Sequence, residues 1–310
     1  MPGIHHVTAI SGAAERNLDF YTRVLGLRLV KKTVNFDDPG TYHLYYGDEH
    51  GAPGTILTFF PWAHAAPGRL GIGETQETAF RVPAASLGFW THRFIEKGVE
   101  HGGLEKRFGE SVLPFIDGDG MRFALVGVAS AENEPGWSGG GVPAEHAIRG
   151  FQGVTLLLRE AAPTARVLTD VLGLTKTGGE GAVTRYASGD THGGHIDLRA
   201  AGDFPRGRLG RGSVHHVAFR AADDAAQAAM TDTAVKLGLH VTEQKDRNYF
   251  RSVYFREPGG VLFEIATDDP GFAVDEAAEN LGEALKLPRF LEARRAEFEA
   301  KLPPLGEEVA

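Results

Sequence analysis

Two histidine pairs lie in short apolar segments near opposite ends of the chain. The first pair belongs to the segment GIHHVT (residues 3–8), and the second belongs to SVHHVAF (residues 213–219). Both segments are rich in β-branched and apolar residues, a pattern that predicts strands. Because neighbouring side chains of a strand face opposite sides, we expect at most one histidine of each pair to point into a shared cavity.

A carboxylate completes the set of residues that could do chemistry. Glu264 stands inside the apolar segment EPGGVLFEI (residues 257–265), and a buried carboxylate is costly unless a positive or hydrogen-bonding group meets it. One histidine from each pair and this glutamate would supply two imidazoles and one carboxylate. Such a ligand set leaves about three positions of an octahedral ion open and is associated with non-haem Fe(II) and oxygen chemistry. The sequence therefore predicts a metal triad.

Composition excludes several other kinds of site and partner. The chain has 310 residues, a formal net charge of −9 and a pI near 5.8. It has no run of lysine or arginine, which argues against nucleic acid or an anionic membrane as partner. The absence of cysteine excludes disulfides, thiolate ligands and cysteine nucleophiles. The first residues do not resemble a signal peptide, and no apolar run is long enough to cross a membrane, so we expect a cytoplasmic protein.

One pattern of secondary structure occurs four times along the chain, which indicates an α+β fold. Each copy reads as a strand, a helix ended by glycine and three further strands; in the first copy the helix spans Glu15–Leu25 and Gly26 ends it. The copies occupy residues 3–62, 76–129, 151–200 and 213–267. We therefore expect four βαβββ modules that form paired half-barrels in two domains (1–130 and 147–270). A C-terminal helical tail (271–310) follows, with helices at Asp275–Lys286 and Arg289–Lys301.

Alignment of the four modules indicates where the metal-binding residues are retained. The histidine of the first strand occurs only as His6 in the first module and His216 in the fourth. Counted from the hairpin glycine, the positions that correspond to Glu264 in the first, second and third modules are Thr58, Ala124 and Leu198. The ligands can therefore meet only if the first module pairs with the fourth, which leaves the second to pair with the third.

These segments resemble the vicinal oxygen chelate superfamily, which includes glyoxalases, bleomycin-resistance proteins and extradiol dioxygenases. Within it, GIHHVT, LTFFPW (residues 57–62), SVHHVAF and KLPPL (residues 301–305) are similar to the ring-cleaving hydroquinone dioxygenase group, over essentially the whole chain. The resemblance implies that His6, His216 and Glu264 are the metal ligands. It also implies a supporting set of site residues around them, namely His5, Thr8, His215, Arg247 and Tyr254.

The implied activity is an Fe(II)-dependent, extradiol-type opening of hydroquinone-like aromatic diols with O₂, and Mn(II) suits the same ligands. Arg247 would neutralise developing oxyanion charge, and Tyr254 would donate a hydrogen bond or a proton. His5 and His215, expected on the opposite face of their strands, would brace the site from behind the ligands. The tail is expected to pack on a sheet or on a second copy of the chain, and homo-oligomerisation stays open.

Two other functions fit the same scaffold. One is a metal-dependent isomerase or lyase of the glyoxalase type, which would require a fourth protein ligand where Thr58 stands. The other is a non-enzymatic drug- or metal-binding resistance protein. The aromatic residues Phe59, Phe60 and Trp62 suit either a substrate pocket or the core. Eight further histidines have no partnered pattern and are expected on the surface or in loops, namely His43, His50, His64, His92, His101, His192, His195 and His240.

Overall fold

The computed structural model describes residues 2–306, and the four predicted modules are all present. The first comprises β1 (Ile4–Ser11), α1 (Ala14–Asp19), a π-helical turn (Phe20–Val24), β2 (Arg28–Asn35), β3 (Asp38–Gly47) and β4 (Ile56–Pro61). The second comprises β5 (Glu74–Pro83), α2 (Leu87–Lys97), β6 (Glu100–His101), β7 (Glu105–Arg107), β8 (Glu110–Ile116) and β9 (Arg122–Val128). The third comprises β10 (Phe151–Leu158), α3 (Ala162–Asp170), β11 (Thr175–Glu180), β12 (Val183–Ala187) and β13 (His195–Ala200). The fourth comprises β14 (Ser213–Ala221), α4 (Asp224–Lys236), β15 (Lys245–Asp246), β16 (Phe250–Arg256) and β17 (Leu262–Pro270).

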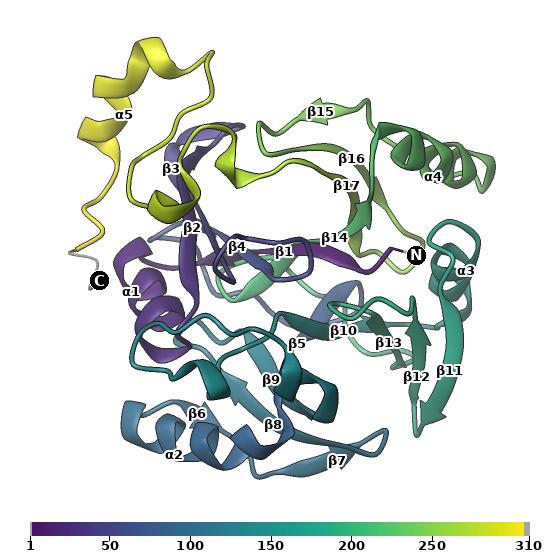
Figure 1. The fold of residues 1–310 in the computed structure, drawn as a ribbon. Helices are drawn as coiled ribbons and strands as arrows, with labels where there is room; N and C mark the ends of the chain where they lie inside the picture. Colours follow the sequence, from purple (N-terminus) through teal and green to yellow (C-terminus); the bar gives the residue numbers. More distant parts are fainter. Residues whose placement is uncertain (1, 307–310) are drawn as a thin grey trace.

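Two curled sheets are assembled from these modules, and each sheet takes one module from each half of the chain. One sheet has the order β15-β16-β17-β14-β1-β4-β3-β2, and the other has β11-β12-β13-β10-β5-β9-β8-β6, with β7 paired to β8. Figure 1 shows the first sheet in the upper half of the molecule and the second in the lower half. The predicted α+β class and the pairing of modules one with four and two with three are confirmed. The proposed domain boundaries at 1–130 and 147–270 stay a prediction.

A continuous hydrophobic core joins the two sheets. Tyr21, from the turn that follows α1, packs its ring against Phe59 of the first sheet and Phe123 of the second, at centroid distances of 4.5 and 6.1 Å. Phe80 stacks on Phe123 and on Phe151 at 5.7 and 5.4 Å. Of the aromatic residues that suited either a pocket or the core, Phe59 thus belongs to the core.

The central strands carry bulges at four equivalent positions. Where β1 pairs with β14, the register shifts between Ile4 and His6, and again between Thr8 and Ala9, so one extra residue lies at His5 and another at His215. The pairing of β10 with β5 shifts in the same way and leaves extra residues at Gln152 and Gln76. A bulge bends its strand and redirects the side chains beside it, which matters below because both histidine pairs lie at bulges.

The tail is less helical than the sequence predicts. After residue 270, the described chain forms one α-helix, α5 (Arg295–Lys301), and the Asp275–Lys286 segment contains only a short 3₁₀ turn (Ala278–Asn280). Gly282 there has φ of +86°, and its backbone approaches the Leu29 carbonyl too closely for a side chain. The fully buried Lys31 ammonium of β2 holds Asp275 and Glu276 at 2.7 and 2.6 Å. These contacts hold the segment on its irregular path, and the positive φ of Gly282 interrupts a helix there.

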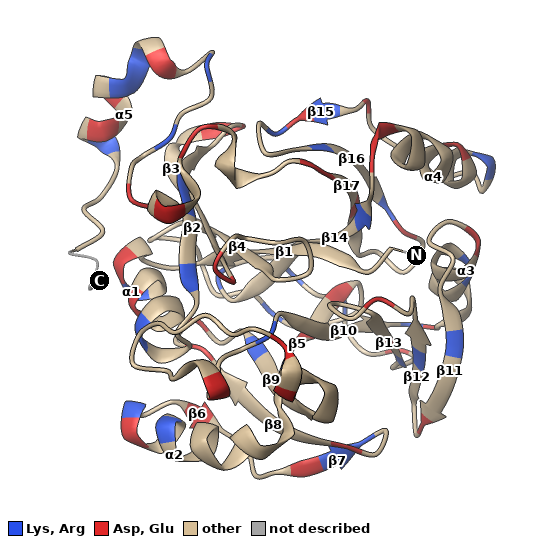
Figure 2. Cartoon of the chain, in the orientation of Figure 1, with Lys and Arg blue, Asp and Glu red and all other residues tan. Residues whose placement is uncertain are grey.

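Charges of both signs are intermixed along the chain. Figure 2 shows acidic and basic segments side by side on α2 and α5, and α5 carries the ion pair Lys301–Glu297 at 2.6 Å. No helix within residues 2–306 has both the length and the apolar character that crossing a membrane would require.

Glu74 of β5 offers a test of how the second sheet tolerates a buried acid. Its side chain is 7% exposed, and burial raises the pKa of its carboxyl to about 7, against an opposing effect of Arg256. The folded state therefore binds a proton more tightly than the unfolded state, so ionisation between pH 4.5 and 7 lowers the free energy of unfolding. We expect Glu74→Gln to change this free energy little at pH 5 and to raise it by about 1 kcal/mol at pH 8.5.

Urea unfolding at the two pH values measures this effect. The exposed Glu132 supplies the matched control, because Glu132→Gln removes the same charge without removing a buried one. An equal gain for Glu74→Gln at pH 5 and pH 8.5 would contradict the assignment of the destabilisation to ionisation.

Candidate metal centre

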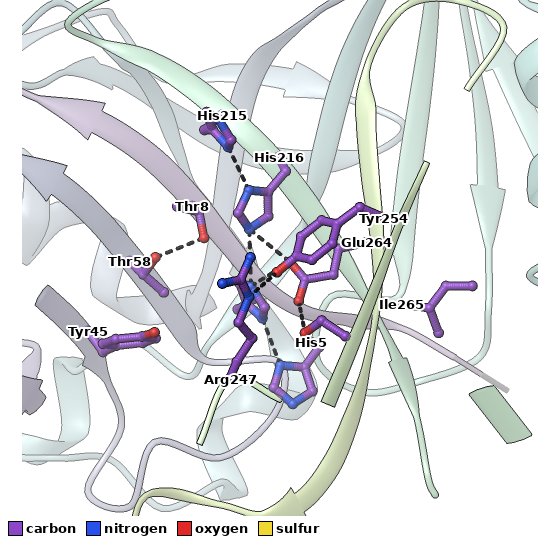
Figure 3. A network of polar contacts seen from close by, with 12 residues as sticks. His5, Thr8, Tyr45, Thr58, His215, His216, Arg247, Tyr254, Glu264 and Ile265 are labelled. Carbon is purple, nitrogen blue, oxygen red and sulfur yellow. Dashed lines mark hydrogen bonds and ion pairs between the residues drawn. The ribbon is translucent and has the colours of Figure 1, made fainter. Parts of the chain in front are cut away.

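Three side chains converge inside the curve of the first sheet. Nε2 of His6 and Nε2 of His216 lie 3.3 and 2.9 Å from Oε2 of Glu264, and the two nitrogens are 3.4 Å apart. All three residues are buried, and their ligand atoms lie within 4.8 Å of one another. Figure 3 shows His216 and Glu264 reaching toward each other from neighbouring strands. The residues named from the sequence are thus brought together as a candidate metal triad.

Strand register explains why these side chains meet. Thr8 of β1 stands opposite His216 of β14, and Ala218, two residues further along β14, stands beside Glu264 of β17. Residues two apart share a face of a strand, so His6 and Thr8 face the same side as His216. Three adjacent strands from the first and fourth modules therefore present one ligand each.

The protonation states suit a cation. Burial lowers the pKa of His216, which keeps its imidazole neutral at pH 7. Burial opposes ionisation of Glu264, but His6 and His216 outweigh it and hold the pKa of the carboxyl well below its usual range. Among residues 2–306, Oε2 of this fully buried carboxylate faces only the two imidazole nitrogens. A neutral imidazole and an ionised carboxylate are the forms that bind a divalent metal, so the residues present fit such an ion.

Ser252 holds the other oxygen of the carboxylate. Its Oγ donates to Oε1 of Glu264 at 2.5 Å, and both residues are fully buried. This contact turns Oε2 toward the two imidazoles. Ser252 was not predicted as a site residue, although it lies two residues before Tyr254 on the same strand, and period-two alternation would have placed both on the face that carries the site.

His5 and His215 do not lie on the opposite face, contrary to expectation. The bulges at these residues turn both rings toward the ligands: Nδ1 of His5 lies 2.9 Å from Nδ1 of His6, and Nδ1 of His215 lies 2.8 Å from Nδ1 of His216. Burial is the main cause that lowers the pKa of His5 to about 3 and that of His215 to about 4. Each neutral ring can accept the Nδ1 proton of its neighbour, which directs the neighbour's Nε2 to the centre of the triad.

Arg247 and Tyr254 lie together beside the triad. Nε of Arg247 donates to the Tyr254 hydroxyl at 3.1 Å, and Nη2 donates to Asp37 of the β2–β3 turn, also at 3.1 Å. The Tyr254 ring stands edge-on to the His216 ring, with centroids 5.7 Å apart. Burial, followed by the Glu264 carboxylate, raises the pKa of Tyr254 above its ordinary value. Tyr254 is therefore a neutral phenol, with a proton to donate, over the physiological range.

The other side of the site contains Thr58, expected there as the counterpart of Glu264, and two residues that were not predicted, His43 and Tyr45. Thr58 of β4 contacts Thr8 and His43 through its hydroxyl, both at 2.8 Å, and His43 in turn contacts the Tyr45 hydroxyl at 2.8 Å. The expectation of His43 on the surface or in a loop is wrong, because it lies on β3 and its ring packs against Phe60 at 4.4 Å. Alternation could have placed His43 and Tyr45 on one face, since Tyr45 pairs with Thr58.

The remaining seven histidines of this set differ in how well the prediction places them. His195 is also misplaced, since it lies on β13 and contacts Gln152 at 3.1 Å. Four others are exposed as expected, namely His50, His64, His92 and His240, and His192 lies in the loop between β12 and β13, also as expected. His101 is half-buried on the edge strand β6.

The matching face of the second sheet carries no such triad. Gly153 and Ala124 stand where the first sheet has His6 and Glu264. The expected equivalence of Thr58 with Leu198 is wrong by one residue: Thr155 pairs with Asp197, because the glycine with positive φ that precedes β13 is Gly193. A cavity of 370 Å³ lies over this face, and its charges pair internally, as Arg185 does with Glu110 and Asp197. Among residues 2–306, a metal-binding cluster occurs only in the first sheet.

Comparison with known proteins identifies the family. The model of the Glyoxalase/Bleomycin resistance protein/Dioxygenase superfamily matches residues 3–123 and 150–265, and the chain belongs to this superfamily. A crystal structure of glyoxalase I from Zea mays has a TM-score of 0.65 at 14% identity and covers 86% of this chain and 93% of that one, which shows a shared fold.

Relatives at higher identity narrow the class. MhqO of Bacillus subtilis, named as a ring-cleaving dioxygenase, is 47% identical over 302 residues, 97% of this chain and 96% of that protein. A chlorohydroquinone/hydroquinone 1,2-dioxygenase from Sphingobium indicum is 35% identical over 303 residues, 96% and 94% of the two chains. The crystal structure of a Bacillus subtilis protein described as a dioxygenase has a TM-score of 0.94 at 46% identity, covering 99% and 98%. The chain thus stands among the ring-cleaving dioxygenases of its superfamily, as its resemblance implied.

Proposed function

We propose that this protein is an Fe(II)-dependent, extradiol-type dioxygenase that opens hydroquinone-like aromatic diols with O₂. The observation that carries the proposal is the buried set of His6, His216 and Glu264, with ligand atoms within 4.8 Å of one another. Two imidazoles and a carboxylate leave positions of the ion open for a substrate oxygen and for O₂. The full-length relatives named as hydroquinone and ring-cleaving dioxygenases support the choice of substrate and reaction.

Iron held by these three residues would supply the electron transfer between the aromatic diol and O₂. The protein supplies position, charge and protons. The two hydroxyls of a hydroquinone stand para to each other and cannot both reach one ion, so the ring is expected to bind through one oxygen. Although burial works against its charge, Tyr254 and Asp37 raise the pKa of Arg247 above its usual value. Its fixed positive charge is placed to stabilise an anionic substrate oxygen, while Tyr254 retains the proton needed for donation.

The isomerase or lyase alternative is less well supported. Its fourth ligand would stand at position 58, and the hydroxyl of Thr58 is engaged with Thr8 and His43. The buried metal-binding cluster within residues 2–306 consists of three residues and includes no fourth acid. A three-residue ligand set keeps more of the coordination sphere free, as a reaction that brings together a diol and O₂ requires.

Metal analysis after anaerobic purification, combined with oxygen uptake on a panel of hydroquinones, tests the proposal. We expect about one iron per chain and one O₂ consumed for each hydroquinone opened. Metal-free protein reloaded with Fe(II) or with Mn(II) distinguishes the two ions. An iron-loaded protein that consumes no O₂ with any hydroquinone would refute the proposed function, and conversion of a substrate without O₂ would favour the isomerase or lyase.

A further inference from the structure

A chain of four polar groups leads from β3 across β4 to the face of β1 that carries the triad. The Tyr45 hydroxyl contacts Nδ1 of His43, Nε2 of His43 contacts Oγ1 of Thr58, and Oγ1 of Thr58 contacts Oγ1 of Thr8, each at 2.8 Å. Thr8 pairs across the strands with His216. Figure 3 shows the threonine pair with Tyr45 beyond it, on the side of the site away from Glu264. This series of hydrogen bonds therefore ends at the face of β1 that carries the candidate metal triad.

The hydrogen bonds in this series share one direction, with each group donating to the next from Tyr45 toward Thr8. With the Thr58 hydroxyl as donor to Thr8, its contact with His43 is one in which Thr58 accepts, because a hydroxyl has a single proton. Burial is the main cause that holds the pKa of His43 well below its usual value, so the ring is neutral and carries one N–H. That proton is then on Nε2, and the bare Nδ1 accepts from the Tyr45 hydroxyl. One tautomer of His43 sets the direction of both threonine hydroxyls.

This direction leaves the Thr8 proton available. Oγ1 of Thr8 accepts from Thr58, and no other partner for this hydroxyl occurs among residues 2–306. Thr8 is fully buried, so bulk water does not satisfy its proton. Because a buried donor without a partner is costly, the site favours a ligand that brings an acceptor oxygen to this position. The opposite tautomer of His43 would reverse the chain and use the Thr8 proton internally.

We propose that His43 is a positioning residue that, through Thr58, presents the Thr8 hydroxyl as a hydrogen-bond donor to an oxygen of the ligand in the metal site. The role rests on the proposed function for the identity of the ligand, an aromatic diol. The direction of these hydrogen bonds does not depend on the substrate, so it can be measured on the protein without substrate.

Imidazole nitrogen NMR of the full-length, zinc-substituted protein tests the direction. With ¹⁵N-labelled histidine, long-range proton–nitrogen spectra distinguish a protonated nitrogen from a bare one, and the His43 signals are those missing in His43→Gln. We expect a protonated Nε2 and a bare Nδ1. A protonated Nδ1 would overturn the proposal, whatever the protein's substrate.

Steady-state kinetics of the iron-loaded protein with hydroquinone test the consequence. Thr58→Val removes the hydroxyl with little change of shape, and the matched control Thr58→Ser retains it. We expect Thr58→Val and His43→Phe to raise KM about tenfold, the scale of one hydrogen bond, with kcat within about threefold. Thr58→Ser should raise KM much less than Thr58→Val does, and His43→Gln, whose amide both donates and accepts, should raise it much less than His43→Phe does.

A double variant separates positioning from general disruption. If Thr58 acts only through Thr8, Thr8→Val combined with Thr58→Val should have the same KM as Thr8→Val alone. The proposal would be overturned if the two single-variant increases in KM multiplied in the double variant, or if Thr58→Val left KM unchanged. A wild-type protein that consumes no O₂ with hydroquinone would instead refute the proposed function, and the NMR measurement would still decide the direction of the chain.

Discussion

Replacement of Glu264 by alanine is expected to abolish oxygen uptake and to remove nearly all bound metal. Glu264 supplies the only charged ligand atom of the triad and is fully buried. Its loss would leave two imidazole ligands without a carboxylate, and this pair attracts a divalent cation much less strongly. We expect metal affinity to fall by more than the roughly 10–100-fold that loss of a supporting residue costs. His216→Ala should have the same result, and metal content with oxygen uptake measured on each purified variant checks both.

Glu257 provides the matched control for this experiment. It is a second buried glutamate just before the same strand, but its carboxylate is satisfied by Thr164 and by the backbone of Gly259 and Val261. Glu257→Gln should lower stability and leave metal content unchanged. Full iron occupancy in both Glu264→Ala and His216→Ala would show that these residues are not ligands.

Replacement of Tyr254 by phenylalanine is expected to leave the metal bound and to lower kcat by about 10²-fold, the scale of a positioned proton donor. The variant removes the hydroxyl that Arg247 contacts at 3.1 Å and keeps the ring that packs against His216. Metal content, the melting temperature and kcat with hydroquinone are the measurements. Loss of metal would indicate a structural role, and an unchanged kcat would show that the hydroxyl takes no part in turnover.

Tyr249 is the corresponding control. Its ring is also buried, and its hydroxyl donates to Asp275 of the tail at 3.0 Å. This hydrogen bond does not involve the triad. Tyr249→Phe removes the same atom from the neighbouring part of the sheet and should change kcat little. Equal losses of kcat in the two variants would mean that Tyr254 acts through the stability of the sheet.

The pairing of the modules could be predicted because it follows from which copies retain the ligands. His6 and His216 occur only in the first and fourth modules, and Glu264 can join them in only one arrangement. The roles assigned to Arg247 and Tyr254 came from the family resemblance, because no local pattern brings them together; the structure shows them in contact. The end of the first helix was also recognisable, because glycine commonly follows a helix in a left-handed conformation. Gly26 has this conformation, with φ of +71°.

Other features could not be predicted from local pattern. Strict alternation places His5 behind its strand, and a single inserted residue reverses that result, because a bulge depends on the partner strand as much as on its own sequence. The path of the tail depends on contacts with Lys31, more than 200 positions away in sequence. His43 has a nearby partner in Tyr45, but its contact with Thr58 forms only because β3 lies beside β4.

The pairing of the first module with the fourth, outside the second and third, also orders the assembly of the protein during synthesis. β1 leaves the ribosome more than 200 residues before its neighbour β14 (Ser11 against Ser213). β5, by contrast, precedes its neighbour β10 by a much shorter stretch of chain (Pro83 against Phe151). The inner pair of modules can thus close first, while one edge of β1 stays open. An open edge is a site for wrong pairing and aggregation, so the nascent chain is most vulnerable over that interval. His6 has both of its partner ligands only when the last strand of the sheet in chain order, β17, has joined it.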